Sequence, residues 1–265
     1  MNEAYVNEAL HKKMVRVIDA IGDRKSLLIA FSGGVDSSVL ARLAVESRAS
    51  VLAVTADSEL LGDCGLAHAR AVADEIRIEH AVFDFGILKR REFVENTHNR
   101  CYHCKKHMVL ELVEIASGSG IETVADGTNT TDLTEDRPGY AAIKEAGVFT
   151  PFVDFGLEKL EIREIARYFG LSVADAPSES CFATRIPTGM EITTQRISRI
   201  VQAESVLHAH GMHGVRVKIR GRDDLACVEI QPRDLERFMA VRGEVAAEFR
   251  QIGFDRTVLS RNHRL

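Results

Sequence analysis

Apolar residues follow a helical period at the start of the chain and then form short continuous runs. Residues 5–22 carry an apolar residue every three or four positions, which predicts an amphipathic leading helix. Residues 26–31 are an apolar run of strand length, followed by a glycine-containing turn and a helical pattern at 37–46. The same alternation continues, with strands expected at 51–55, 80–85 and 122–126 and helices at 65–76 and 107–115.

This alternation of strands and helices predicts βαβ units and a parallel sheet. In such a fold, ligands bind beyond the carboxyl ends of the strands. The turn after the first predicted strand, residues 32–36, lies at such an end.

The pattern weakens after Pro151. A helix is expected at 158–169, ended by Gly170, and a loop rich in small residues follows at 174–189. Beyond the loop we expect helices at 193–210, 232–239 and 244–252 and strands at 215–219, 226–230 and 256–259. We therefore place a domain boundary in the loop, giving an α/β domain at 1–180 and a smaller α+β domain at 181–265.

Composition narrows the class of protein. The 265 residues are 45% hydrophobic and 28% charged, as in ordinary globular proteins. No apolar run reaches the roughly 20 residues of a membrane span, and residues 1–16 mix acids and bases, so we expect a cytoplasmic protein with no membrane partner. The net charge of −5 makes nucleic acid an unfavourable partner, although the chain is basic after Thr193. That basic excess fits either a solvated face or a phosphate-bearing ligand.

The turn at 32–38 reads Ser-Gly-Gly-Val-Asp-Ser-Ser and has the features of a phosphate site. Paired glycines let backbone N–H groups approach an anion, the hydroxyls add donors, and the following helix N-terminus adds partial positive charge. A carboxylate repels phosphate, so Asp36 implies a bridging Mg²⁺. The alternative is a tight turn with Asp36 or Ser37 as the helix N-cap. The candidate phosphate ligands are Ser32, Gly33, Gly34, Asp36, Ser37 and Ser38.

This segment resembles the PP-loop of the ATP pyrophosphatase superfamily. The resemblance implies an adenine nucleotide alpha hydrolase-like domain that cleaves ATP between its α and β phosphates. AMP would remain on the substrate, and pyrophosphate would leave. The segment contains no Walker lysine, which disfavours transfer of the γ-phosphoryl group.

A second polar turn, Asp126-Gly-Thr-Asn129, closes a predicted strand, so its side chains should emerge on the ligand side of the sheet. In the superfamily that it resembles, this segment lies near the nucleotide, which implicates Asp126, Thr128 and Asn129. The alternative is a glycine turn stabilised by an Asx residue. The nearby Asp136-Arg-Pro-Gly139 could position substrate or form a turn.

The chain has five cysteines, an odd number, which disfavours a disulfide framework. Cys101 and Cys104 form a CxxC pair beside the basic residues 100, 105 and 106, whose charges favour thiolates. Cys181 stands alone in the interdomain loop. The alternative for the pair is two buried thiols or a zinc site completed by a histidine at 103 or 107. Cys64 and Cys227 fit no ligand spacing and are expected in the core.

Several motifs in order resemble the LarE family, sulfur transferases that mature the nickel-pincer cofactor of lactate racemase. They are the PP-loop, Arg-Cys-Tyr-x-Cys-Lys, Asp-Gly-Thr-Asn, Arg-Pro-Gly and Cys-x-Ala-x-Arg-Ile-Pro-x-Gly. The resemblance implies that ATP adenylates a carboxylate of pyridinium-3,5-biscarboxylic acid mononucleotide and that sulfur displaces AMP to give a thiocarboxylate. The sequence departs from the family at Thr184, where Ser is usual, and at Lys218, where Arg is common.

The resemblance leaves two sources of sulfur open. Cys181 could attack as a thiolate and then lose its sulfur, leaving dehydroalanine. Alternatively, a [4Fe–4S] cluster on Cys101, Cys104 and Cys181 could carry an exchangeable sulfide, which is the interpretation we prefer.

The same resemblance suggests substrate contacts in the second domain. Arg216 and Lys218 lie at i and i+2 of one predicted strand and could together hold the phosphate of the mononucleotide. Arg185 lies near Cys181, and Glu204 and Asp234 match acidic positions of the family; the alternative for these side chains is ordinary surface charge. We also expect a homo-oligomer and a downstream nickel-insertion protein as partners. The rival functions are a PP-loop tRNA thiolase and a nucleotide- or metal-sensing protein without catalysis.

Overall fold

The computed structural model describes residues 6–134, 138–177, 180–221 and 224–260. The chain forms two compact units. The first contains Met1–Ser58, Asp63–Ile87 and Asn99–Ser178. The second contains Glu179–Leu265 and also takes in Glu59–Gly62 and Leu88–His98, two segments from within the range expected for the first domain.

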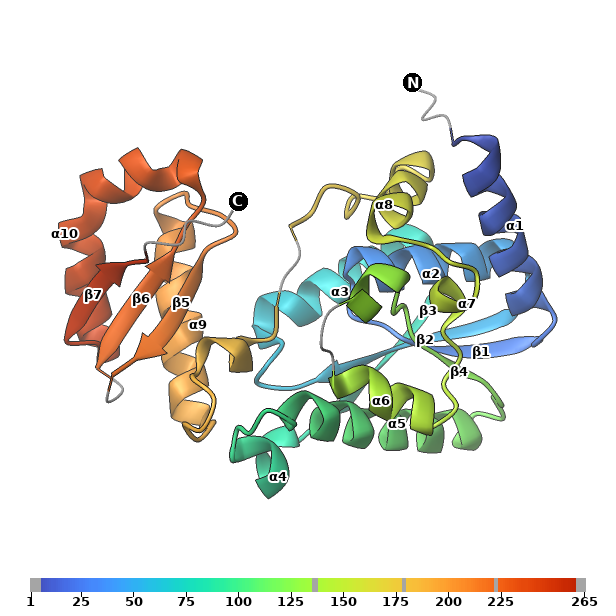
Figure 1. The fold of residues 1–265 in the computed structure, drawn as a ribbon, viewed down its shortest axis with the longest axis horizontal. Helices are drawn as coiled ribbons and strands as arrows, with labels where there is room; N and C mark the ends of the chain where they lie inside the picture. The colour runs from blue at the N-terminus through green and yellow to red at the C-terminus, as the bar shows by residue number, and fades with distance from the viewer. Residues whose placement is uncertain (1–5, 135–137, 178–179, 222–223, 261–265) are drawn as a thin grey trace. The chain divides into compact units, whose positions relative to one another are not determined.

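The first unit is built on a parallel sheet with strand order β3-β2-β1-β4 (Figure 1). In register, Leu28 of the central strand pairs with Leu52 on one side and Val124 on the other. The chain moves outward from β1 to β3 and then returns to place β4 on the opposite side of β1, which creates a topological switch point between β1 and β4. The parallel α/β fold expected from the sequence is therefore confirmed. The strands are β1 (Ser26–Ala30), β2 (Ser50–Asp57), β3 (Glu79–Asp84) and β4 (Val124–Ala125).

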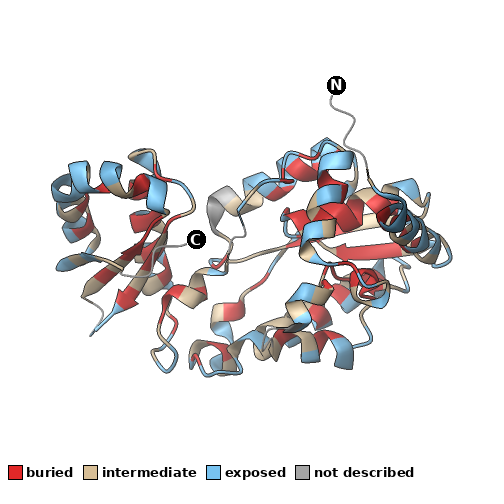
Figure 2. Ribbon diagram, turned by 45° about the horizontal axis from the view of Figure 1, so that its top comes forward, coloured by how far each residue is buried: buried red, intermediate tan, exposed pale blue. Residues whose placement is uncertain are grey.

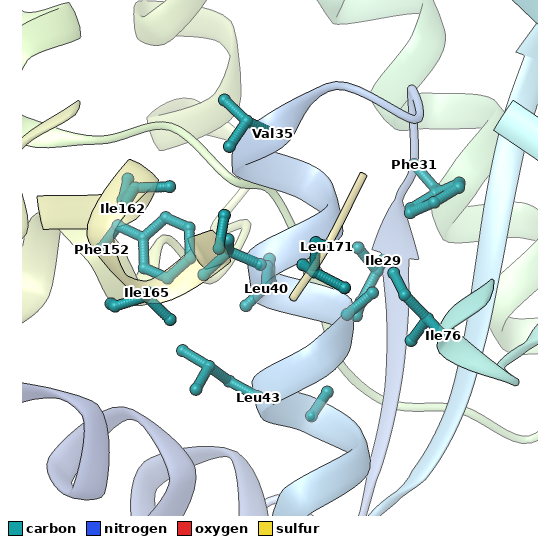
Figure 3. Close-up of a cluster of buried hydrophobic side chains, with 14 of the residues drawn as sticks. Ile29, Phe31, Val35, Leu40, Leu43, Ile76, Phe152, Ile162, Ile165 and Leu171 are labelled. Carbon is teal, nitrogen blue, oxygen red and sulfur yellow. The ribbon is translucent and has the colours of Figure 1, made fainter. Parts of the chain in front are cut away.

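Helices cover both faces of this sheet (Figure 1). Leu27 and Ile29 point into the larger core, part of which Figure 3 shows, and Leu28 points into a smaller core under α5. Buried positions of this unit concentrate on the strands and the inner helix surfaces (Figure 2). Helices α1 (Glu8–Gly22), α2 (Val35–Glu46), α3 (Gly62–Ile76), α7 (Pro151–Asp154) and α8 (Lys159–Tyr168) supply the larger core, and α6 (Pro138–Glu145) packs on α5 (Arg100–Gly118).

The second unit is a small mixed sheet with two long helices. Strand β5 is antiparallel to β6, and β6 is parallel to β7. Within the described residues of the chain, no helix combines the length and the apolar character needed to cross a membrane. Its elements are α4 (Arg91–Val94), α9 (Thr194–Ala209), β5 (Arg216–Arg220), β6 (Leu225–Glu229), α10 (Leu235–Ile252) and β7 (Arg256–Leu259), with short 3₁₀ turns at Phe182–Arg185 and Pro232–Asp234. A further 3₁₀ turn, Thr130–Thr134, lies in the first unit, and another, Ile87–Lys89, begins in the first unit and ends in the second.

Asn96 fastens the segment 88–98 into the second unit. Its buried side-chain amide donates hydrogen bonds to the carbonyl oxygens of Pro187 at 2.8 Å and Met190 at 2.7 Å. The backbone of Asn96 is left-handed, with φ of 54°, a conformation that asparagine tolerates better than most residues. The segment therefore belongs to this unit through buried hydrogen bonds that its position in the sequence does not suggest.

Two helix predictions were wrong in instructive ways. The helices expected at 232–239 and 244–252 form one helix, α10, because Phe238, Val245 and Phe249 share a buried face across Gly243. A glycine in a helix interior costs only about 1 kcal/mol, which such packing exceeds. Helix α5 begins at Arg100, well before residue 107, because its first two turns lack the apolar residues that periodicity detects.

Because His80 lies in the first unit's sheet, it should make the stability of that unit depend on pH. Its Nε2 lies 2.7 Å from the Thr55 hydroxyl, which donates to the carbonyl of Phe31. Burial lowers the pKa of His80, and Arg70 adds to this effect while Asp74 opposes it. The unfolded chain therefore binds the proton more readily, so this contribution is complete above about pH 6.5 and is lost as the pH falls.

We expect His80→Gln to flatten the fall in unfolding free energy between pH 7.5 and pH 5.5, measured by urea unfolding. His68→Gln, at an exposed histidine of the same unit, is the control and should keep the wild-type slope. An unchanged slope in His80→Gln would contradict the assignment.

Candidate functional site

The turn after β1 is shaped by Gly33. Its φ is 72°, and a Cβ atom at this position would lie 2.7 Å from the Cα of Ala69 on α3. Both observations exclude other residues without a backbone shift. The turn leads directly into α2, whose N-cap is Gly34, so the helix N-terminus is available to an anion.

The hydroxyl groups of this turn hold its own backbone. Ser37 and Ser38 donate to the carbonyl oxygen of Gly34 at 3.1 and 2.8 Å. The exposed Ser32 lies with its Oγ 3.1 Å from that of Ser37. Ser37 and Ser38 are buried, and their hydroxyl groups hold the backbone of the turn. Ser32 instead presents its hydroxyl at the surface.

Asp36 is the charged centre of the turn. Its Oδ1 accepts a 3.1 Å hydrogen bond from the Asn129 side chain, and its Oδ2 is ion-paired with Lys159, the first residue of α8. Asn129 is fully buried and also donates to Asp132 at 2.9 Å. Three segments distant in sequence thus converge on one half-buried carboxylate, which faces a cation at one oxygen.

The turn after β4 packs against the turn after β1. A Cβ atom on Gly127 would lie 3.0 Å from the backbone of Asp36 and Ser37, so any side chain here would push the two backbones slightly apart. Asp126 is buried and accepts hydrogen bonds from the backbone and hydroxyl groups of Thr128. The structure therefore brings together the two polar turns that the sequence singled out, at the switch point of the sheet.

Lys105 completes the charge balance of Asp126. Its Nζ lies 2.9 Å from Oδ2 of Asp126. Burial opposes ionisation of Asp126, but Lys105 and the hydrogen bonds from Thr128 outweigh it and hold the pKa of the carboxyl below its usual value. In turn, Asp126 raises the pKa of Lys105 against the opposing effect of burial. Both groups are therefore charged at neutral pH.

The CxxC pair lies in the first two turns of α5. Cys101 is exposed and Cys104 is half-buried. A helix N-terminus stabilises thiolates, so the setting suits nucleophilic or metal-binding sulfur. Helix α6 packs nearby, since a Cβ atom on Gly139 would lie 3.4 Å from the Cys101 carbonyl oxygen. Asp136 and Arg137, expected either to position substrate or to form a turn, lie outside the described residues.

The cysteines do not form a complete metal site within the described residues, where no three His, Cys, Asp or Glu side chains are grouped to hold an ion. Cys181 is exposed and belongs to the second unit, whereas the CxxC pair belongs to the first. Cys227 is half-buried on β6 between the buried Ala226 and Val228, so the core position expected for it is wrong. The side chain of Cys64 lies outside the described set.

In the second unit, Arg185 organises the Cys181 loop. It is 5% exposed, and its Nε donates to Glu204 at 2.9 Å while Nη1 donates to the carbonyl oxygens of Ser180 at 2.7 Å and Cys181 at 3.3 Å. Glu204, on α9, also accepts from the backbone N–H of Val217 at 2.9 Å. The two residues expected to contact substrate are thus paired with each other and anchor the loop that carries Cys181.

The other charged residues expected at this site lie on β5 and directly before α10. Arg216 and Lys218 share a face of β5, as expected from their spacing. Lys218 pairs with Glu229 at 2.6 Å, a contact the sequence did not suggest. Asp234, at the start of α10, is 8% exposed, and its Oδ2 has no hydrogen-bond partner among the described residues.

Sequence reasoning missed two lysines of the first unit's site. Lys159 looked like an ordinary first-turn helix residue, and Lys105 was considered only for its effect on the thiols. A usable signal existed in both cases, because a carboxylate that a predicted polar turn wholly or partly buries requires a partner. Which lysine or arginine becomes that partner depends on the tertiary fold.

Comparison with known proteins adds an independent finding. The asparagine synthase family matches residues 19–111. The chain is 34% identical to an uncharacterized protein of Synechocystis sp., covering 92% of each. It is 28% identical to the pyridinium-3,5-bisthiocarboxylic acid mononucleotide synthase of Lactiplantibacillus plantarum, covering 92% of this chain and 89% of the relative. It is also 31% identical to a tRNA-specific 2-thiouridylase of Sphingopyxis alaskensis, covering 63% of this chain and 53% of the relative.

The buried Arg185–Glu204 pair yields a stability prediction. Arg185→Met should lower the free energy of unfolding by about 3–5 kcal/mol because Glu204 remains buried without its counter-ion. Combining it with Glu204→Gln should recover part of the loss, since the uncompensated charge is then removed. Urea unfolding provides the measurement.

Arg256→Met, at an exposed pair of the same unit, is the control and should change the free energy of unfolding by less than about 1 kcal/mol. Equal losses in Arg185→Met and Arg256→Met would refute the argument.

Proposed function

The chain belongs to the LarE family within the PP-loop ATP pyrophosphatase superfamily, and from that membership we propose that it is an ATP-dependent sulfur transferase. The substrate we propose is pyridinium-3,5-biscarboxylic acid mononucleotide, one carboxylate of which becomes a thiocarboxylate. The related synthase of L. plantarum carries the corresponding dithiocarboxylic product in its name.

The observation that supports ATP activation most directly is the convergence of the two polar turns on Asp36. The loop at 32–38 offers a helix N-terminus and the exposed Ser32 hydroxyl to a pyrophosphate group. Asp36 already attracts a cation, since its Oδ2 pairs with Lys159, and it is the residue of the loop that would hold a Mg²⁺ ion. When bound, Mg²⁺ would neutralise charge on the leaving pyrophosphate.

In the proposed first step, a substrate carboxylate oxygen attacks the α-phosphorus of ATP. The bond between that phosphorus and the bridging α–β oxygen breaks, and its electron pair leaves with pyrophosphate. The residues of the PP-loop would bind this leaving group, where negative charge develops. Asp126, Thr128 and Asn129 would position the nucleotide beside it.

In the proposed second step, a sulfur nucleophile attacks the acyl adenylate, a carbon–sulfur bond forms, and AMP leaves with the electrons of the carbon–oxygen bond. Cys101, Cys104 and Cys181 are the thiols we assign to sulfur delivery. We favour their joint ligation of a [4Fe–4S] cluster, which would supply an exchangeable sulfide when bound. Supporting this assignment, the CxxC thiols share a helix N-terminus and Cys181 is exposed. Consumption of the Cys181 sulfur itself is the alternative.

We assign the second unit's polar residues to substrate and loop positioning. Arg216 and Lys218 would bind the phosphate of the mononucleotide from one face of β5. Arg185 and Glu204 would act through the Cys181 loop, since the guanidinium is bonded to the loop backbone. Asp234 would orient substrate from the start of α10.

A tRNA thiolase remains the second candidate function because one relative named above is a tRNA-specific 2-thiouridylase. The net charge of −5 disfavours an extended RNA surface. A gel shift with bulk tRNA separates the two functions: retention of tRNA at physiological salt would favour the thiolase. A sensor without catalysis would bind ATP but release no pyrophosphate with any acid.

The proposed activation chemistry predicts AMP and pyrophosphate as products when ATP and the dicarboxylate substrate are supplied with Mg²⁺. Asp36→Asn should lower kcat by about 100-fold or more, since it removes the charge that would hold the metal at the leaving group. Product identity is measured by chromatography of the nucleotides. Asp175→Asn, at an exposed aspartate of the same unit, should retain wild-type activity. Formation of ADP would overturn the proposal.

The source of sulfur is decided by elemental analysis of anaerobically purified protein and by intact mass before and after turnover. About four irons and four acid-labile sulfides per chain are expected, and Cys101→Ala should lose them. Cys227→Ala, at a cysteine outside the proposed set, should retain them. Protein without iron that loses about 34 Da at Cys181 would instead show that the chain consumes its own cysteine.

A further inference from the structure

Lys105 stands between the CxxC pair and the turn after β4. It follows Cys104 directly on α5, and its Nζ lies 2.9 Å from Oδ2 of Asp126. The side chain of Asp126 is 11% exposed and that of Lys105 is 34% exposed, so water is largely excluded from the carboxylate and partly from the lysine. Helix α6 confines the lysine, because a Cβ atom on Gly139 would lie 3.1 Å from its Cγ.

The contacts continue from Asp126 to the PP-loop. The second oxygen of this carboxylate accepts both hydrogen bonds from Thr128 and so fixes the turn. The turn after β4 also touches the start of α2 through Gly127. From the same turn, the side chain of Asn129 donates a 3.1 Å hydrogen bond to Asp36. An unbroken series of contacts within the first unit therefore joins the CxxC helix to the nucleotide loop.

We propose that Lys105 is a positioning residue that couples the CxxC turn to the nucleotide-binding turns, so that nucleotide occupancy changes the accessibility of the Cys101 and Cys104 thiols. The inference rests on the proposed function, because it takes ATP as the ligand of the switch point. Lys105 suits this role since it is covalently adjacent to Cys104 and is held at its other end by the carboxylate of a nucleotide turn.

Coupling of this kind is reciprocal: a ligand that orders the nucleotide turns must favour one arrangement of the CxxC turn, and a change at the thiols must alter nucleotide affinity by the same factor. A bound triphosphate adds negative charge beside the turns, which attracts the Lys105 ammonium while Asp126 still binds it. A lysine held by two anions would hold the first two turns of α5, which carry the thiols, more firmly. We expect the thiols to react more slowly as a result.

The experiment uses the full-length chain after its iron has been removed with a chelator and the removal checked by elemental analysis, because a bound cluster would occupy the same thiols. It measures alkylation of Cys101 and Cys104 by iodoacetamide, using peptide mass spectrometry. The probe is α,β-methylene-ATP with Mg²⁺, which cannot be cleaved between the α and β phosphates. In the wild type, saturating probe should slow alkylation about fivefold or more. Lys105→Met should abolish this protection while still binding the probe, and Lys105→Arg should restore most of it. Lys106→Met, at the exposed neighbouring lysine, is the matched control and should behave as the wild type.

The outcomes separate this inference from the proposed function. If Lys105→Met binds the probe and its thiols remain protected, the nucleotide merely shields them and the inference is wrong, although ATP activation stands. If protection depends on Lys105 but the chain forms no AMP and pyrophosphate, the coupling stands and the proposed function fails. Should Lys105→Met not fold, Asp126→Asn breaks the same link from the other side and is judged by the same loss of protection at saturating probe.

Discussion

The close approach of two turns at the end of the parallel sheet is the constraint on which the first unit's site depends. Gly127 brings the backbone after β4 within contact of the first residues of α2, where even a Cβ atom would lie only 3.0 Å from the Asp36 and Ser37 backbone. This approach lets Asn129 reach Asp36 and places Lys159 on the other oxygen of the same carboxylate. A charge that would be costly to bury alone is thereby compensated by groups from two other parts of the chain.

The strand order explains why this contact occurs where it does. Strands β2 and β3 are added on one side of β1, and β4 is then added on the other side. This change of side makes β1 and β4 neighbours whose connections lead to opposite faces of the sheet. Helix α2 covers one face and α5 the other, so the helix proposed to bind phosphate begins at the touching turns on one side of the sheet, and the thiol-bearing helix begins near them on the other. Activation and sulfur chemistry, as proposed, would share this edge of the sheet.

Local sequence predicted much of this architecture. The buried strand at 26–30 and the glycine turn after it were recognisable because continuous apolar runs and paired glycines have few other uses. The start of α5 and the existence of α6 were not recognisable. The first two turns of α5 have few apolar residues, and α6 begins with Pro138 and Gly139, so the helical state of both depends on packing between the two helices. Lys105, Lys159 and the Arg185–Glu204 pair escaped for a related reason: ion pairs join residues by tertiary proximity, which periodicity does not encode. The assignment of sites to substrate and cluster remains a prediction.

The interleaving of segments in the second unit bears on how the chain is made. Asn96 emerges from the ribosome some ninety residues before Pro187 and Met190, the carbonyl groups that its side chain holds. During synthesis the segment 88–98 must therefore remain without its native partners while the surrounding parts of the parallel sheet are already available to fold. A fragment cut at the loop near residue 180 would separate Asn96 from those same carbonyls, so the two units cannot be exchanged between proteins as simple consecutive modules.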